Sequence, residues 1–180
     1  MSLRQFEGFT PVLDLTVFVD STALIIGNVS AGEDSSFWPL VVVRGDIHRI
    51  SIGARSNIQD GTVIHVTHDG PFNPGGYATI IGDDVTVGHK VMLHGCTIAD
   101  RVLIGMGAIV MDGAVVESEV VVGAGSLVPP GKRLQSGHLY VGSPVKQIRP
   151  LSEKERAYFT YSSQRYVELK DRHLQSLSQP

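Results

Sequence analysis

Two histidines of this chain have the spacing that a shared metal ion requires. His65 and His94 each directly follow an aliphatic residue at the same position of a repeated frame, Ile64 and Leu93. They lie 29 residues apart, and removing one 18-residue coil leaves 11 residues, about the size of a loop expected after His65. Adjacent coils are spaced like paired strands, about 4.8 Å apart. We therefore expect the two imidazoles to stack and to bind one metal at Zn–N distances near 2.0–2.1 Å.

His89 belongs to a different face of the same coil, because it follows Val87, the aliphatic residue of the preceding frame, by two residues. One subunit cannot easily bring it to the other pair, whereas a three-fold neighbour packed against that face can supply it. Three His ligands with an open fourth position are typical of catalytic zinc sites. A single histidine on such a coil is usually solvated, so the hypothesis depends on the joint placement. His48, His138 and His173 have no comparable register.

Amide and carboxylate side chains precede His65 by one frame, at Asn57, Gln59 and Asp60. This spacing places them on turns near the metal edge, where such groups can orient a substrate oxygen or a metal ligand. Capping of the coil corners is an equally good interpretation, because Asn and Asp are frequent in tight turns. The residues alone leave both interpretations open.

A six-residue repeat must position these side chains. Aliphatic residues recur about every six positions from residue 81 to residue 128, with one frame a residue short. A period of 3.6 predicts a helix and a period of 2 an ordinary strand, whereas six residues form one face of a triangular coil. Three faces make one turn of a parallel β-helix, with the aliphatic residue inside and glycine at the sharp bends. The repeated aliphatic residues are Ile81, Val87, Leu93, Ile98, Ile104, Val110, Val116, Val122 and Val128.

The coil is expected over residues 11–148 of a single domain, 1–180, with two interruptions. The stretch from Arg44 to Arg49 predicts a small bulge, in which Arg44 and Asp46 either hold the bulge or form a salt bridge across subunits. Residues 66–79 contain two Pro and three Gly and predict a loop that leaves the coil.

A C-terminal helix is expected over residues 152–176, because Ser152-x-x-Glu155 is typical of a capping box. Its apolar positions predict a lid on the apolar face of the coil, either its own or a neighbour's. These positions are Phe159, Tyr166, Leu169 and Leu177.

Composition excludes several classes of partner. The 180 residues are 42% apolar and carry a net charge of −3, and their Lys and Arg are scattered, so we expect no nucleic-acid partner. No apolar run reaches the roughly 18 residues that a membrane span needs, and the first residues lack an apolar signal core, so we expect no membrane association and a cytoplasmic location. The lone Cys96 is expected to be a small core residue.

These residues form a set of motifs: Arg44-Gly-Asp46, Asn57-Ile-Gln59-Asp60-Gly61, Ile64-His65, Gly88-His89, His94-Gly95, Ile104-Gly-Met-Gly107 and Tyr140-Val-Gly-Ser-Pro144. Over about residues 10–177 the chain thereby resembles the gamma-class carbonic anhydrase family of hexapeptide-repeat proteins. The resemblance implies an all-β, left-handed parallel β-helix that forms a homotrimer with zinc sites at its subunit interfaces. Imidazole ligands also suit Fe²⁺ and Co²⁺.

The resemblance also implies roles for individual residues. His65 and His94 would come from one subunit and His89 from the next, in agreement with the register. Gln59 would contact the zinc-bound hydroxide, and Asn57 would support it. The residues implied to join subunits are Arg44, Asp46 and Asp60. The catalytic candidates are Gln59, Asn57, His68 and Tyr140.

The chain departs from archaeal members of the family, which carry acidic residues for proton transfer. Ile47 occupies the position of one such acid, directly after the Arg-x-Asp element. The loop after the first metal histidine reads Val66-Thr-His-Asp-Gly70, which leaves His68 and Asp69 as the candidates for proton shuttles.

The sequence therefore predicts a zinc-dependent enzyme that hydrates CO2 to bicarbonate, in which zinc lowers the pKa of its bound water to about 7. One alternative is a hexapeptide-repeat acyltransferase, which typically needs one catalytic His and a pantetheine groove. Another is a metal-dependent CoA thioesterase, which would keep the metal. The third is a non-catalytic metal-binding trimeric scaffold.

Overall fold

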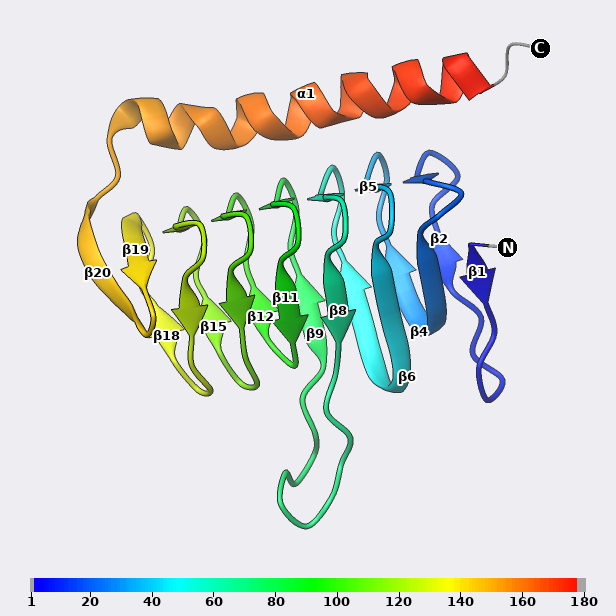
Figure 1. The fold of residues 1–180 in the computed structure, drawn as a ribbon, viewed down its shortest axis with the longest axis horizontal. Helices are drawn as coiled ribbons and strands as arrows, with labels where there is room; N and C mark the ends of the chain where they lie inside the picture. The colour runs from blue at the N-terminus through cyan, green and yellow to red at the C-terminus, as the bar shows by residue number, and fades with distance from the viewer. Residues whose placement is uncertain (1, 178–180) are drawn as a thin grey trace.

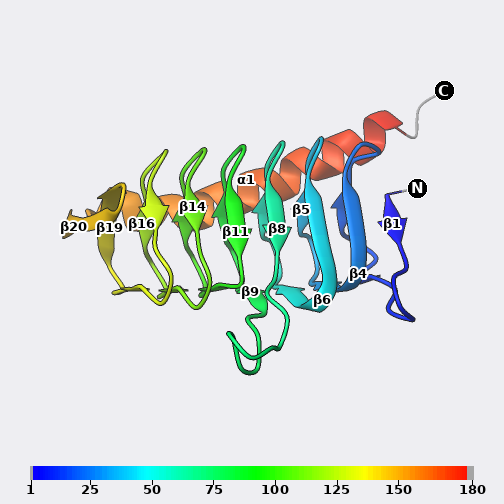
Figure 2. The same ribbon diagram turned by 60° about the horizontal axis from the view of Figure 1, so that its bottom comes forward.

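The computed structural model describes residues 2–177 and shows a parallel β-helix with a long C-terminal helix (Figure 1). Short strands stack coil on coil along one axis, and each coil passes through three faces (Figure 2). The predicted fold class, a left-handed parallel β-helix followed by an α-helix, is confirmed. The six-residue period produces this shape because each frame supplies one short strand and one bend.

We name each face after one of its strands. The β8 face holds β8 (Val63–His65), β11 (Met92–His94), β14 (Ile109–Val110) and β17 (Leu127–Val128). The β9 face holds β9 (Thr79–Ile81), β12 (Thr97–Ile98), β15 (Val115–Val116) and β18 (Arg133–Leu134). The β10 face holds β3 (Phe18–Val19), β5 (Ser36–Phe37), β7 (Asn57–Ile58), β10 (Thr86–Val87), β13 (Leu103–Ile104), β16 (Val121–Val122), β19 (His138–Gly142) and β20 (Val145–Pro150).

The first coils are built differently, around two long strands that connect the β8 and β9 faces. These are β4 (Leu24–Ala31) and β6 (Val42–Ile52), and the short strands β1 (Leu3–Arg4) and β2 (Val12–Leu13) pair with β4. Pairing therefore starts at residue 3, earlier than the residue 11 expected from the repeat. Between β4 and β6 the register jumps from Gly27↔Gly45 to Val29↔Ile50. Residues 46–49 thus oppose a single residue, which confirms the predicted bulge.

The core is a set of columns of aliphatic side chains. Ile64, Leu93, Val110 and Val128 stack in register on the β8 face, and each is fully buried. Each such side chain contributes about 1.5–3 kcal/mol by leaving water. Cys96 is 1% exposed, and burial raises the pKa of its thiol to about 12, so the core role predicted for it is confirmed.

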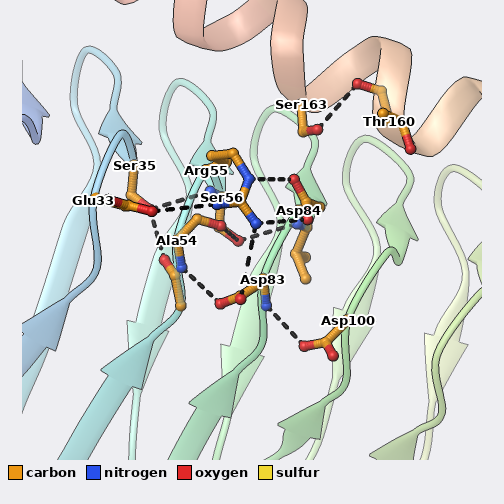
Figure 3. A network of polar contacts seen from close by, with 12 residues as sticks. Glu33, Ser35, Ala54, Arg55, Ser56, Asp83, Asp84, Asp100, Thr160 and Ser163 are labelled. Atoms are coloured by element: carbon orange, nitrogen blue, oxygen red, sulfur yellow. Dashed lines mark hydrogen bonds and ion pairs between the residues drawn. The ribbon is translucent and has the colours of Figure 1, made fainter.

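Carboxylates hold the corner between the β9 and β10 faces (Figure 3). Asp83 accepts a bond from the backbone N–H of Ala54 at 2.8 Å, and Asp100 accepts one from the N–H of Asp83 at 2.9 Å. Arg55 forms a bidentate pair with Asp84 at 2.8 and 2.9 Å. Each carboxylate therefore links its own coil to the preceding one, which fixes the stacking that the metal candidates depend on.

The helix α1 (Glu153–Leu177) begins at the predicted capping box. Ser152 Oγ accepts the N–H of Glu155 at 3.3 Å, and Glu155 Oε2 accepts the N–H of Ser152 at 2.8 Å. The helix runs back along the β10 face of its own chain, against β3, β5 and β10 (Figure 1).

The predicted apolar face of α1 is only partly correct. Phe159 is buried, but Leu177 is 74% exposed, and the other buried positions are polar: Ser162, Ser163 and Lys170. The physical reason is that this surface of the coil presents hydroxyl and carboxylate groups. Ser162 meets Thr86 at 2.9 Å, and the Lys170 ammonium meets Asp34 at 2.9 Å.

Candidate metal centre

His65 and His94 lie side by side at the ends of two neighbouring strands. The two residues are register partners in the pairing of β8 with β11. His65 Nδ1 and His94 Nε2 face each other at 3.1 Å, and their ring centroids are 5.1 Å apart. The structure therefore brings together the two histidines that the 29-residue spacing paired.

A carboxylate on the far side of each ring determines which nitrogen carries the proton. His65 Nε2 lies 3.0 Å from Asp46 Oδ1, and His94 Nδ1 lies 2.8 Å from Asp112 Oδ1. An ionised carboxylate can only accept, so these ring nitrogens donate. In the neutral rings, the two nitrogens that face each other are then both acceptors. Two acceptors cannot bond to each other, so this arrangement requires a cation or a proton between them.

The distance between the facing nitrogens fits a shared metal. Two ligands at 2.0–2.1 Å in a tetrahedral site are separated by about 3.3 Å, close to the observed 3.1 Å. A carboxylate behind each ligating imidazole is the usual arrangement in metal proteins, because it fixes ring orientation and increases basicity. The donor set of this edge therefore fits a divalent metal.

Burial and the nearby Arg44 cation together lower the pKa of His65 below its ordinary value. The hydrogen bond to Asp46 opposes them and raises this pKa. Burial by itself would raise the pKa of Asp46, but the hydrogen bond from Arg44 and the bond to His65 lower it overall. Arg44 Nη1 lies 2.6 Å from Asp46 Oδ2 within the chain. A neutral imidazole beside an ionised carboxylate is the state that binds metal.

His89 lies on a different corner of the coil, between β10 and β11. Its Nδ1 is 2.8 Å from Asp60 Oδ2, so it donates there, and its Nε2 is left as an acceptor. The side chain is 45% exposed. Within residues 2–177 of one chain, no group of three His, Cys, Asp or Glu side chains gathers in a metal-binding arrangement. One subunit therefore presents a pair at one corner and a third imidazole with the same carboxylate support at another.

Gln59 lies beside His89 and is oriented by a chain of hydrogen bonds. Gln59 Nε2 donates to Asn57 Oδ1 at 3.0 Å, and Asn57 Nδ2 donates to Thr86 Oγ1 at 3.1 Å. Thr86 Oγ1 in turn meets Ser162 of α1 at 2.9 Å. Gln59 and His89 both line a cavity of about 460 Å³ beneath the helix. Asn57 thus holds the amide of Gln59 in one orientation next to His89.

The expected proton-transfer residues lie near the His65 side of the site. His68 and Asp69 line a cavity of about 540 Å³ together with Asp46 and His48. Asp46 belongs both to this cavity and to the hydrogen bond with His65. The cavity thus extends from the loop residues to Asp46, on the far side of the His65 ring.

Tyr140 is not brought to any of these histidines. It is 3% exposed in β19, and its hydroxyl accepts the N–H of Gln135 at 2.8 Å and donates to Gln147 at 3.1 Å. Strands β13 and β16 separate β19 from β10. The side chain fills the C-terminal end of the coil, and within one subunit the structure gives no support for a catalytic role of Tyr140.

Asp112 is the residue that the sequence reasoning missed. It accepts hydrogen bonds from His94 Nδ1 and from Thr67 Oγ1 at 2.9 Å. A partial signal was available, because Asp112 follows His94 by 18 residues, one more than the 17 residues that separate the register partners Leu93 and Val110.

The described part of the chain has no helix long and apolar enough to cross a membrane.

No protein-family model matches the chain. It is 59% identical over 172 residues to Protein YrdA from Escherichia coli strain K12, covering 96% of this chain and 94% of that protein. It is 42% identical over 167 residues to gamma carbonic anhydrase 2, mitochondrial, from Arabidopsis thaliana, covering 91% of this chain but 59% of that protein.

A solved structure has a similar fold, that of a hexapeptide transferase family protein from Anaplasma phagocytophilum. It matches with a TM-score of 0.87 and 40% identity, covering 94% of this chain and 96% of that one.

Proposed function

The chain belongs to the gamma-carbonic-anhydrase-like hexapeptide-repeat proteins, and on this premise we propose that it is a zinc-dependent hydratase of CO2. The metal would be held between subunits of a cytoplasmic homotrimer, by His65 and His94 of one copy and His89 of the next. Fe²⁺ or Co²⁺ would fit the same ligands.

One observation carries the proposal: two acceptor nitrogens face each other at 3.1 Å, each fixed by a carboxylate on the far side of its ring. His89 with Asp60 repeats that arrangement at another corner. Three imidazoles that each present an acceptor nitrogen are the ligand set of a catalytic zinc site.

An exposed apolar column on the β8 face supports the shared site. The outward residues Val42, Val63, Met92, Ile109 and Leu127 stack in register beside the histidine edge. Met92 is 44% exposed and Ile109 40% exposed. A continuous apolar strip of this kind favours burial against another copy. The proposed trimer would bury it and bring the corner of His89 to the histidine pair.

The bound metal would supply a hydroxide nucleophile near neutral pH. The chain's own residues would do the rest. Gln59 has one N–H engaged by Asn57, and its second N–H would donate to the substrate oxygen. His68 and Asp69 lie in the cavity behind Asp46 and would pass protons to solvent, in place of the family's acidic residues.

Stopped-flow CO2 hydration tests the proposal, on protein reconstituted anaerobically with zinc or iron and with metal content measured on the same sample. We expect activity that disappears, together with the metal, in His94→Ala. The matched control is His138→Ala, whose ring bonds the carbonyl of Ser136 at 2.8 Å and does not approach the pair. Full metal occupancy without hydration would contradict the proposal.

A metal-dependent thioesterase is the second candidate, and one observation favours it. The cavity beside Gln59 and His89 is lined by aliphatic residues and two tyrosines, which would suit an acyl group. The similarity to a hexapeptide transferase family protein favours the other alternative, an acyltransferase, which would use the same cavity for its acyl group. Hydrolysis of acyl-CoA by metal-loaded protein that is inactive toward CO2 would support this candidate.

A further inference from the structure

A hairpin with an exposed aromatic tip projects from the coil directly after His65. Residues 66–78 connect β8 to β9, and Figures 1 and 2 show them extending away from the solenoid. Thr67 and Tyr77 exchange backbone hydrogen bonds at 3.0 and 2.9 Å, and Gly70 and Asn73 do so at 3.3 and 3.1 Å. Phe72, between these last two residues, is 92% exposed.

Two side chains hold the hairpin in this shape. Asp69 Oδ1 accepts the N–H of Gly75 at 2.7 Å, and His48 Nε2 donates to the carbonyl of Gly75 at 3.3 Å. The tip from residue 70 to residue 76 contains no charged residue. The hairpin thus holds a phenyl ring in water on an ordered, uncharged tip, and burial of this ring against another surface would be favourable.

The cavity beneath α1, which we call the helix cavity, is an apolar receptor of suitable kind. Its volume is about 460 Å³, and no Lys, Arg, Asp or Glu side chain lines it. Leu103, Met106 and Val121 form part of its floor, and Tyr158 and Tyr166 of α1 form its roof. Met106 is 58% exposed, so the chain leaves this surface open on its own.

The proposed metal site would place the hairpin and the helix cavity next to each other across an interface. The hairpin starts at His65, and His89 is part of the cavity wall. Joining the His65 of one copy to the His89 of the next therefore brings the hairpin base to the cavity rim. Phe72 lies five residues beyond Thr67, a reach of up to about 17 Å in extended chain. The cavity covers β10, β13 and β16, about 10 Å of stacked strands.

We propose that the hairpin of one copy lies across the helix cavity of the next, with Phe72 inserted among Leu103, Met106 and the tyrosines of α1. This inference rests on the proposed interfacial site. The consequence is substrate selection: the phenyl ring closes the space beside Gln59 that an acyl group would use, and the site is left open only to a molecule as small as CO2.

Site-directed cross-linking tests the proposal on the full-length protein. In Phe72→Cys/Met106→Cys, oxidation should link copies into covalent oligomers that dithiothreitol reverses. Phe72→Cys/Leu15→Cys is the matched control, because Leu15 is fully exposed on a different corner of the coil, and it should stay unlinked. Cys96 needs no replacement, because burial raises its pKa to about 12 and it is 1% exposed.

Sedimentation equilibrium of the same samples separates the two hypotheses. A trimer that binds metal but does not cross-link would overturn the hairpin contact and leave the proposed function standing. A monomer would overturn both.

A dye measurement completes the test. Phe72→Ala should bind several-fold more 8-anilinonaphthalene sulfonate than the wild type, because the cavity opens, while Phe72→Leu should not. Equal dye binding by wild type and Phe72→Ala would show that Phe72 does not close the helix cavity and would overturn the proposal.

Discussion

Replacing Asp112 by Ala should weaken metal binding, although Asp112 is not one of the proposed metal ligands. Asp112 accepts the Nδ1–H of His94 at 2.8 Å and so leaves Nε2 as the acceptor that faces His65 at 3.1 Å. Without the carboxylate, the ring can rotate or carry its proton on Nε2, and either change removes the lone pair from the site.

Loss of a carboxylate behind a ligating histidine typically costs 10–100-fold in metal affinity, or about 1.4–2.8 kcal/mol. The assay is a competitive zinc titration against a chromophoric chelator at constant pH. Asp100→Ala is the matched control, because its carboxylate bonds the backbone N–H of Asp83 on another corner. If Asp112→Ala binds zinc as tightly as Asp100→Ala, the reasoning from ring orientation is refuted.

Three further predictions concern the amide, the helix packing and the helix cap. Gln59→Ala should lower kcat for CO2 hydration by about 10² with metal content unchanged, because it loses a donor to the developing charge. Asp34→Ala should lower the free energy of unfolding in urea by about 1–3 kcal/mol, because it removes a partner of the buried Lys170. Lys170→Met should lower this free energy by less, because it leaves no buried ammonium without its partner. Glu155 has its pKa lowered to about 2 by the hydrogen bond from Arg149, then by those from Ser152, so its contribution to the stability of α1 should be complete above pH 4.5 and lost as the pH falls toward 2.

A contrary outcome exists for each prediction, and the first also has a matched control. Gln164→Ala, on the exposed side of α1, should leave kcat unchanged, and an equal loss in both variants would contradict the role of Gln59. A Lys170→Met variant less stable than Asp34→Ala would argue against the ion pair. The acid unfolding of Glu155→Gln can be followed by circular dichroism. If its curve has the wild-type shape between pH 4.5 and 2, the cap is excluded as the source of the pH dependence.

The histidine pair was predictable because the coil has a fixed length. Subtracting one coil from the spacing of His65 and His94 left a remainder the size of the loop, and the strands then paired these residues directly. The same arithmetic applied to carboxylates would have placed Asp112 within one residue of the position one coil after His94. Asp112 was missed because only histidines were compared across coils.

The packing of α1 was less predictable, because the surface it covers is not apolar. The buried hydroxyl of Ser162 and the ammonium of Lys170 are stabilised by Thr86 and Asp34. Both partners lie more than 70 residues earlier in the chain, as the 76-residue separation of Thr86 and Ser162 shows. A helical pattern of apolar residues does not contain that information, since the partners determine which polar groups can be buried.

The central claim, a metal site shared by two copies, is tested most directly by mixing subunits. His65→Ala and His89→Ala proteins should each bind no zinc, because each variant lacks one ligand at every interface. After the two are unfolded together and refolded, every mixed trimer contains one interface with an intact His65–His94 pair facing an intact His89. The account predicts that zinc binding and CO2 hydration return in the mixture, at up to one site per mixed trimer. Zinc retained by His89→Ala alone, or no recovery in mixed trimers verified by mass spectrometry, would contradict it.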